Sequence, residues 1–244
     1  AICLGEVLPS LLRGEGQTDT CTCGSKINSC SVWNNFVDRK TEQKDYPLTY
    51  VKLAEKALSI SNGNAIIDTS KSLEGLSPLL GNNELETKVI WLIKDIRSFV
   101  YSQISRTKRQ ELMKKDGWRR IYTTTILYNI LQWRIGNGRI LHFLTSRNIP
   151  FIRIGYEELC FRTETIIQKI ALFTGLKCDT PISLIPSKNH MIRGNRLRMG
   201  LDTEKLIIRY DYEWMKKMSI GIASFFMTPF LGWNTKHVYS NYEQ

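Results

Sequence analysis

The stretch Lys88–Arg106, KVIWLIKDIRSFVYSQISR, places an apolar run directly before a segment with helical spacing. Lys88–Ile93 has the length and the β-branched residues of a buried parallel strand. From Ser98 onward, apolar residues and serines recur every three to four positions, which predicts a helix. Such a strand–helix unit brings free backbone N–H groups and Lys94 to one edge of a sheet, where α/β proteins bind phosphorylated ligands. A unit whose polar residues merely face water is the alternative interpretation.

Net charge narrows the class of partner. The chain has 34 Lys+Arg against 23 Asp+Glu, a net charge of +11 over 244 residues. This excess favours an anionic partner such as a nucleotide, an acidic glycan, nucleic acid or an anionic membrane. The densest basic cluster, Arg106–Arg120, contains Glu111 and Asp116 and so differs from a disordered nucleic-acid-binding tail. At this length and at 42% hydrophobic residues, we expect one large α/β domain or two small ones.

Targeting and membrane signals are not evident in the sequence. Residues 1–12 lack the charged start of a signal peptide. The longest apolar run, Ile220–Trp233, is too short to span a membrane and contains Pro229. We therefore predict no transmembrane segment in this chain, and we interpret the run as a partly buried C-terminal element.

Three cysteines, Cys21, Cys23 and Cys30, lie within ten residues of one another. Three thiolates could bind zinc, but a structural zinc site needs four ligands and no histidine lies nearby in the sequence. A local disulfide, which requires an oxidising compartment, and free buried thiols are the other interpretations. We favour free thiols and expect no metal.

Strand-like and helical segments alternate along the chain, which predicts a mostly parallel sheet. The expected helices are Leu48–Ile60, the largely helical stretch Trp118–Leu144 and Thr163–Phe173, and the further strands are Ile66–Asp68 and Phe151–Ile154. We expect Gly136-Asn-Gly138 to break the second of these into two helices.

Two more polar clusters flank these elements. Asp68–Ser72 follows the first short strand, where a solvated loop with a helix-capping serine would be an adequate explanation. Ser187–Met199, SKNHMIRGNRLRM, is a basic, Gly-containing segment that suits guanidinium and backbone contacts to a phosphate, or equally a basic surface loop. His190 within it is by default a solvated histidine.

Five segments, which follow one another along the chain in the family's order, resemble the sulfotransferases that use 3′-phosphoadenosine 5′-phosphosulfate (PAPS). The stretch KVIWLIKDIRSFVYSQISR resembles the 3′-phosphate motif of that family, a strand followed by Arg-Asp-Pro-Arg and then by a serine eight residues after the first arginine. The other four are GEVLPSLLRGEG…CTCGSKINSCSVW, IIDTSKS, IGYEELC…IALFTGL and HMIRGNRLR.

The resemblance implies a fold and a reaction. The fold would be a three-layer α/β domain over residues 1–244, with a central parallel sheet related to that of P-loop NTPases. The family's first strand, phosphate loop and first helix have no counterpart here, so we expect little activity from this chain alone. The family's reaction transfers a sulfonyl group from PAPS to a hydroxyl or amine acceptor, which could be a carbohydrate, and it needs no metal.

Matching positions give the implied site residues. Lys94 and Ser102 would bind the 3′-phosphate, Tyr156 would lie near the adenine, and Lys71 would be catalytic, near the sulfonyl group and the acceptor. The loop that closes over the nucleotide would be formed by Gly194, Asn195, Arg196 and Arg198. Lys94 departs from the family's arginine, which keeps the charge but loses bidentate contact. Ile96 replaces its proline.

The catalytic base is left open among Glu6, Asp68, His190 and Glu157. We further predict that Ile66–Asp68, Val89–Ile93 and Phe151–Ile154 form one sheet, with Lys71, Lys94 and Tyr156 at the carboxyl ends of the strands.

Other functions and partners remain open at this stage. A non-catalytic protein of the same fold that binds a nucleotide or an acidic glycan is the main alternative. A nucleic-acid-binding module is not expected, because no recognised motif accompanies the positive charge. The partner would be a small-molecule or glycan acceptor. The sequence leaves the oligomeric state open, and the compartment could be the cytoplasm or the Golgi lumen.

Overall fold

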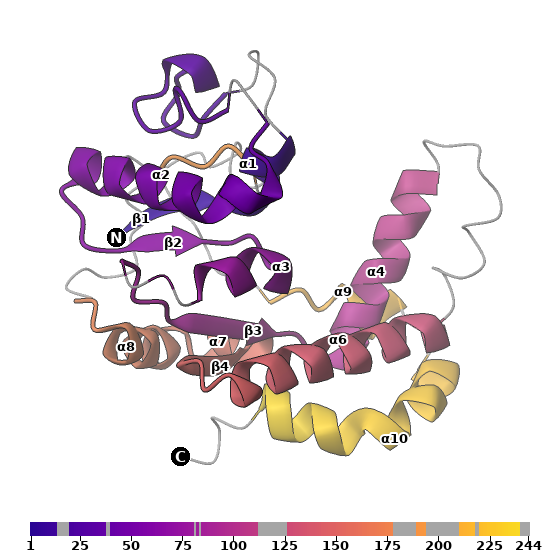
Figure 1. Cartoon of the computed structure of the whole chain (residues 1–244). Coiled ribbons are helices and arrows are strands. Elements are labelled where there is room, and N and C mark those ends of the chain that lie inside the picture. Colours follow the sequence, from indigo (N-terminus) through magenta and orange to yellow (C-terminus); the bar gives the residue numbers. More distant parts are fainter. Residues whose placement is uncertain are drawn as a thin grey trace. The chain divides into compact units, whose positions relative to one another are not determined.

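The structure is a computed structural model of the chain. It describes residues 1–13, 20–37, 40–80, 82, 84–111, 126–177, 189–193, 210–217 and 220–239. The chain forms two compact units: unit 1 comprises Ala1–Thr87 and Thr180–Leu206, and unit 2 comprises Lys88–Asp179 and Ile207–Gln244 (Figure 1). Among the described residues, none of the helices has the length and apolar content that a membrane crossing requires.

Unit 1 is built on a pair of parallel strands, β1 (Ile2–Gly5) and β2 (Ile66–Asp68), in which Ile2 lies opposite Ile66. Its helical elements are α1 (Val7–Arg13), η1 (Ile27–Ser29), η2 (Gln43–Asp45), α2 (Tyr46–Ser61), α3 (Leu73–Leu76) and η3 (Ser77–Leu79). Helix α2 packs on both strands (Figure 1). Its buried face repeats at helical spacing through Tyr46, Tyr50, Leu53 and Ala57.

Unit 2 is built on a second parallel pair, β3 (Val89–Ile93) and β4 (Phe151–Gly155), in continuous register from Val89 opposite Phe151 to Ile93 opposite Gly155. Its helices are α4 (Ile96–Glu111), α6 (Ile126–Ser146), α7 (Tyr156–Phe161), α8 (Thr163–Thr174), α9 (Glu213–Lys217) and α10 (Ile220–Val238). Helices α4, α6 and α10 pack on one another (Figure 1).

Strand β3 is not buried on both faces as the apolar run predicted. Trp91 and Ile93 are buried, whereas Ile90 and Leu92 are 43% and 52% exposed. The side chains of a strand alternate between two faces, and here one face packs into the core while the other does not.

The predicted break in the second helix is also wrong. Helix α6 runs without interruption through Gly136 and Gly138. Each glycine costs about 1 kcal/mol of helix propensity relative to alanine, but the buried side chains of Ile130, Trp133 and Leu144 anchor the helix on both sides of the pair.

The α/β class and the parallel strand pairing are as predicted, and strands lie at the three predicted places. They pair as two two-stranded sheets, β1 with β2 and β3 with β4. A single central sheet in a three-layer domain therefore stays a prediction. Strand β1 was not predicted, because Ile2–Gly5 is too short for a periodicity to show.

Candidate functional site

Lys94 and Tyr156 lie together at the carboxyl ends of β3 and β4. Each residue directly follows its strand, and the parallel register brings the two strand ends side by side. The Lys94 Nζ lies 5.0 Å from the centre of the Tyr156 ring and 3.9 Å from Oδ2 of Asp211, a side chain that is 47% exposed. Burial raises the pKa of Tyr156 to about 12, so the phenol stays neutral. A cation and a neutral aromatic ring thus share this edge.

The turn between β3 and α4 is held by three other helices. The indole Nε1 of Trp133 in α6 donates to the Lys94 carbonyl at 2.8 Å. The Asp95 N–H donates to Oε2 of Glu157 in α7 at 3.0 Å, and the Ile96 N–H donates to Oδ1 of Asn234 in α10 at 2.9 Å. The free N–H groups expected at this turn are therefore already bonded, and the Lys94 side chain is the group left to contact a ligand.

Asp95 is a buried structural carboxylate. Nε and Nη2 of Arg97 donate to its two oxygens at 2.9 and 2.8 Å, and Asn234 and the Tyr239 hydroxyl donate to Oδ2 at 2.9 and 2.8 Å. Burial alone would raise the pKa of Asp95, but the hydrogen bonds and charge of Arg97 hold it below its usual value. The ionised carboxylate joins α4 to α10 and fixes the turn that carries Lys94.

Glu157 is fully buried next to this turn. Its Oε2 accepts the Asp95 N–H, and its Oε1 has no hydrogen-bond partner among the described residues. Burial raises the pKa of Glu157 to about 7, against the opposing effects of the Asp95 N–H and of the Lys94 charge. Near neutral pH, this carboxyl is therefore partly protonated and poorly placed to reach a substrate.

The other strand pair carries Lys71. Lys71 has a left-handed backbone, with φ at 56°, and its Nζ lies 3.2 Å from Oε1 of Glu6, which follows β1. A non-glycine residue in this conformation is strained, and such strain is concentrated at functional sites. The Lys71 side chain is 69% exposed and that of Glu6 is 28% exposed, so solvent can reach both.

Asp68 is occupied by neutral donors of its own unit. Its Oδ1 accepts from the N–H and the hydroxyl of Ser70, at 2.8 and 2.5 Å, and more distantly from the Val7 N–H at 3.4 Å. Burial raises the pKa of Asp68, and the hydrogen bonds from Ser70 oppose that effect. These contacts tie the start of α1 to the end of β2, which is a structural role.

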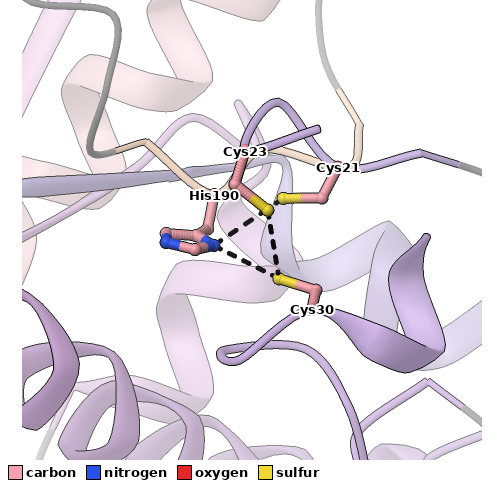
Figure 2. Close-up of side chains that lie close together, drawn as sticks. All are labelled: Cys21, Cys23, Cys30 and His190. Atoms are coloured by element: carbon pink, nitrogen blue, oxygen red, sulfur yellow. Dashed lines mark hydrogen bonds between the residues drawn. The ribbon is translucent and has the colours of Figure 1, made fainter. Parts of the chain in front are cut away.

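A cluster of sulfur and nitrogen atoms lies elsewhere in unit 1, where Cys21, Cys23 and Cys30 meet His190 (Figure 2). Their ligand atoms all lie within 4.8 Å of one another. The histidine was not predicted as a ligand from the sequence, because it is 160 residues from Cys30. A weak signal was present: the chain has three histidines, and the other two, His142 and His237, fall in helical segments.

The structure thus brings two of the predicted site residues together, Lys94 and Tyr156. Ser102 is half-buried in the second turn of α4 and forms no hydrogen bond with Lys94. Lys71 pairs with Glu6, and His190 faces the cysteines rather than solvent. The predicted nucleotide loop, Gly194, Asn195, Arg196 and Arg198, lies outside the described residues.

Comparisons of the chain with models of known protein families, with curated proteins and with solved structures found no match. Function therefore has to be inferred from the side chains themselves. Two arrangements offer chemistry: the cation and aromatic ring at the end of β3 and β4, and the cysteine–histidine cluster of unit 1.

Proposed function

We propose that this chain is a sulfotransferase-like domain that binds a 3′-phosphorylated adenosine nucleotide, with PAPS as the sulfonyl donor. The observation that carries the proposal is the pairing of Lys94 with Tyr156. These residues belong to two separate motifs 62 positions apart in the sequence, and they lie side by side at the end of two parallel strands. The carboxyl ends of parallel strands are where open α/β sheets bind ligands.

The chemistry of this pair suits such a nucleotide. The ion pair between Lys94 and Asp211 is long, at 3.9 Å, and its Asp211 side chain is 47% exposed, so it is weak and a doubly charged phosphate can displace it. The Tyr156 ring offers a face on which a purine can stack, and stacking is worth about 1–3 kcal/mol per base in single-stranded nucleic-acid complexes. Asp95 and Arg97 hold the turn, so Lys94 would be presented at a fixed place.

Sulfonyl transfer needs a base and positive charge near the transferring group. On the resemblance alone, we assign Lys71 to stabilise the negative charge of the transferring sulfonyl group, and we assign its neighbour in unit 1, Glu6, as the base. Glu6 is half-buried and contacts Lys71, whereas Asp68 is bonded to Ser70 and Glu157 is buried. In this step the acceptor proton passes to the Glu6 carboxylate. The acceptor oxygen or nitrogen bonds to sulfur, and the bond from sulfur to the phosphate oxygen breaks to release 3′,5′-ADP.

A non-catalytic binding protein is the second candidate. It is favoured by the turn after β3, whose N–H groups are bonded to protein side chains and leave only lysine for the phosphate. A lysine binds phosphate as a point charge, without the two parallel hydrogen bonds of an arginine. Such a protein would bind 3′,5′-ADP or an acidic glycan without transferring the sulfonyl group of PAPS.

Calorimetric titration of 3′,5′-ADP and 5′-AMP into the wild type and Lys94→Ala tests the proposal. A charge-assisted contact is worth about 1.5–3 kcal/mol, so the variant should bind 3′,5′-ADP roughly ten- to a hundredfold more weakly and 5′-AMP almost unchanged. Lys94→Arg should bind at least as well as the wild type. Lys88→Ala, at the other end of β3, is the matched control and should bind both nucleotides normally. Equal losses for the two nucleotides would contradict the 3′-phosphate assignment.

An assay of PAPS turnover with glycan, phenol and amine acceptors separates the enzyme from the binding protein. Lys71→Ala should lower kcat by about 10²–10³-fold, the typical cost of losing one stabilising donor at a developing charge. Lys44→Ala, an exposed lysine paired with Glu42, should have no effect. Because little activity is expected from this chain alone, the test is whether its weak turnover depends on Lys71. Nucleotide binding with no turnover, or with turnover that Lys71→Ala leaves unchanged, would favour the second candidate.

A further inference from the structure

We infer that Cys21, Cys23, Cys30 and His190 form a structural zinc site in unit 1. Three thiolates and one imidazole are a ligand set that structural zinc sites use. The inference replaces the free thiols that we favoured from the sequence, and it stands independently of the nucleotide proposal, because it uses none of the same residues.

Three of the distances between ligand atoms are close to those of a tetrahedral zinc centre. With Zn–S bonds of about 2.3 Å and tetrahedral angles, two sulfurs lie roughly 3.8 Å apart, and a sulfur and a nitrogen lie roughly 3.6 Å apart. The Cys23 and Cys30 sulfurs are 3.8 Å apart. His190 Nδ1 lies 3.8 Å from the Cys21 sulfur and 3.2 Å from the Cys30 sulfur. All four ligand atoms lie within 4.8 Å of one another, so a zinc ion would bind between them once the most widely spaced atoms moved closer by up to about 1 Å.

Each ligand is presented by ordered backbone. Cys21 and Cys23 lie on a tight turn closed by hydrogen bonds from Cys21 N–H to the Ser25 carbonyl and from Gly24 N–H to the Cys21 carbonyl, both 2.9 Å. Gly24 has φ at 89°, which favours glycine. Cys30 directly follows η1. The three sulfurs and the imidazole converge from this loop and from a segment far along the chain (Figure 2).

Backbone N–H groups also point at two of the sulfurs. The Cys23 N–H lies near the Cys21 sulfur, and the N–H groups of Val32 and Trp33 lie near the Cys30 sulfur. Hydrogen bonds to the ligand atoms are what orient and support ligands around a protein-bound metal. The loop is therefore shaped to hold thiolates at fixed positions, beyond what a buried thiol requires.

A disulfide explains the cluster less well. Disulfide sulfurs lie about 2.05 Å apart, and the sulfurs of Cys23 and Cys30 are separated by 3.8 Å. Any single disulfide would use two sulfurs and leave the third thiol and His190 without a purpose. A tetrahedral ion uses all four ligand atoms and leaves no open position, so this site would be structural rather than catalytic.

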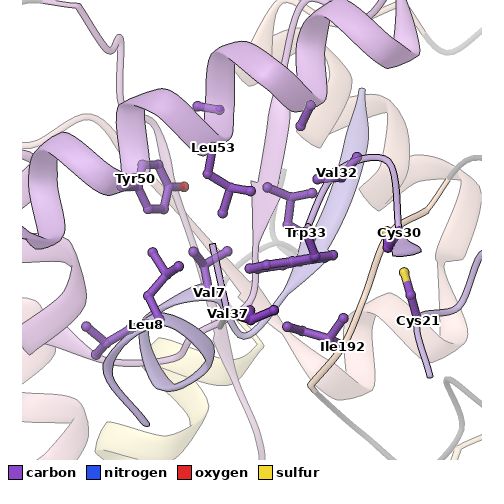
Figure 3. Packing of buried hydrophobic residues seen from close by; sticks show 14 of the residues in the cluster. Val7, Leu8, Cys21, Cys30, Val32, Trp33, Val37, Tyr50, Leu53 and Ile192 are labelled. Atoms are coloured by element: carbon purple, nitrogen blue, oxygen red, sulfur yellow. The ribbon is translucent and has the colours of Figure 1, made fainter. Parts of the chain in front are cut away.

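The segment from Thr20 to Val37 shows what the ion would stabilise. Within it, the regular elements are the short η1 turn and a bridge between Thr20 and Lys26. Nevertheless Ile27, Val32 and Trp33 are almost fully buried against the core of unit 1 (Figure 3). A loop with so little regular structure needs another constraint to bury large side chains, and a metal supplies one by binding only the folded chain.

The segment that carries His190 is independently fixed. His190 N–H donates to the Cys3 carbonyl of β1 at 3.0 Å, Thr22 N–H donates to the Met191 carbonyl at 3.1 Å, and Met191 N–H donates to the Thr22 hydroxyl at 3.0 Å. The Thr22 hydroxyl donates to the Asn189 carbonyl at 2.8 Å. Zinc would thus join the cysteine loop to a segment already aligned with β1.

The first test is the metal content of the full chain purified without chelators. We expect one zinc ion per chain by mass spectrometry of the metals, and we expect Co²⁺ added to the metal-free protein to give the intense visible bands of a tetrahedral thiolate site. Cys30→Ser should lose the zinc. Its affinity should fall by more than the roughly 10- to 100-fold that loss of an outer hydrogen-bond partner costs. His190→Cys should keep the zinc and shift the Co²⁺ bands, because a fourth thiolate replaces the imidazole.

Matched controls separate the site from general damage. Cys160→Ser and His142→Asn change residues of the same type in unit 2 and should retain one zinc ion. If Cys30→Ser does not fold, the Co²⁺ spectra of the wild type and His190→Cys still decide. Absence of zinc from the wild type with an octahedral Co²⁺ spectrum would overturn the inference. A mass lower by two hydrogens that marks a disulfide among these cysteines, or loss of zinc from Cys160→Ser as well, would do the same.

Discussion

In both units a strand ends at a glycine against which a distant backbone carbonyl lies. A Cβ atom added at Gly5, the end of β1, would lie 2.3 Å from the Arg193 oxygen. One added at Gly155, the end of β4, would lie 2.0 Å from the Val238 oxygen. Real Cβ atoms essentially never approach a backbone atom so closely, so each strand end accepts a remote segment only because it lacks a side chain. Both parallel strand pairs therefore use a glycine at a strand end to admit a remote backbone segment.

The units differ in the groups that bind the aspartate at the end of a strand or just after it. Asp68 at the end of β2 accepts from the neutral donors of Ser70 and Val7. Asp95 after β3 is paired with the Arg97 guanidinium. Unit 1 thus relies on backbone and hydroxyl donors, and we infer a metal, whereas unit 2 relies on an internal ion pair. The same position in a strand–helix connection can be stabilised in either way.

The largest loss of unfolding free energy should come from Gly5→Ala. This variant tests whether the glycine at the strand end is equally necessary in both units. Gly5 has φ at 76°, so alanine adds about 1–2 kcal/mol of backbone strain to about 1–3 kcal/mol for the displaced Arg193 carbonyl. Gly155 has φ at −73°, which any residue can adopt, so Gly155→Ala should cost only about 1–3 kcal/mol for displacing a backbone carbonyl, here that of Val238. Urea unfolding measures both.

Gly175→Ala is the control for backbone strain, because Gly175 has φ at 75° and nothing within 4 Å of an added Cβ. We expect it to cost only the backbone strain, about 1–2 kcal/mol. Gly5→Ala should also lower zinc content, since Arg193 and His190 belong to one segment. A cost for Gly5→Ala no larger than that for Gly175→Ala would mean that the close approach of Arg193 carries no energy.

The next effect is that of Asp95→Asn against Asp68→Asn, which sharpens the contrast between the ion pair and the neutral donors. Removing the Asp95 charge leaves Arg97 without its partner and should cost about 3 kcal/mol, at the low end of the range for buried pairs because the Arg97 side chain is 38% exposed. Asp68→Asn keeps an oxygen acceptor and should cost about 1 kcal/mol. Hydrogen exchange followed by mass spectrometry would assign each loss to its unit, and similar losses would remove the contrast.

A smaller effect concerns the ligand edge of unit 2. Tyr156→Leu should weaken 3′,5′-ADP binding by roughly tenfold, because a stacked ring is replaced by an aliphatic side chain. The loss should be the same for 5′-AMP, since the ring would contact the purine and not the 3′-phosphate. Tyr128→Leu, on the exposed part of α6, is the matched control. Calorimetry on both nucleotides measures the change, and a loss confined to 3′,5′-ADP would contradict the assignment of the ring to the base.

The smallest effect should appear in the pH dependence of stability. On acidification, the contributions of the two aspartates to the unfolding free energy should change in opposite directions. Asp95 has a lowered pKa, so its stabilisation is present above the ordinary aspartate pKa and is lost as the pH falls through the folded value. Burial raises the pKa of Asp68, so ionised Asp68 destabilises unit 1, and acidification through the folded pKa relieves that penalty.

The comparison requires the unfolding free energy of the wild type and of both asparagine variants between about pH 3 and pH 7, a range that spans the ordinary aspartate pKa. Asp95→Asn should remove an acid-induced loss of stability in unit 2. Asp68→Asn should remove a slight gain in unit 1, slight because the hydrogen bonds from Ser70 oppose the effect of burial. Slopes of the same sign for the two variants would contradict the opposite pKa directions.

Local sequence patterns correctly predicted those features of the fold that depend on interactions between neighbouring residues. The strands at 89–93 and 151–154 followed from their apolar runs, and the pairing of Lys94 with Tyr156 followed from the rule that parallel strands share a carboxyl edge. Contacts between distant segments could not be predicted in this way. His190 meets Cys30 across 160 residues, and the N–H groups after β3 are bonded to side chains from α7 and α10. Tertiary packing likewise overrode the helix-breaking tendency of Gly136 and Gly138.

Unit 1 is formed by two segments that are far apart in the sequence, Ala1–Thr87 and Thr180–Leu206, so the ribosome makes them at different times. The three cysteines emerge long before His190, which follows Cys30 by 160 residues. At about 5–20 residues per second, the delay is roughly 10–30 s. During that time the strands of unit 2 are made, while β1 still lacks the backbone partners that His190 and Arg193 supply. The part of the protein that is translated first is therefore completed late, and for the zinc site that we infer to form, its cysteines would have to stay reduced until the histidine arrives.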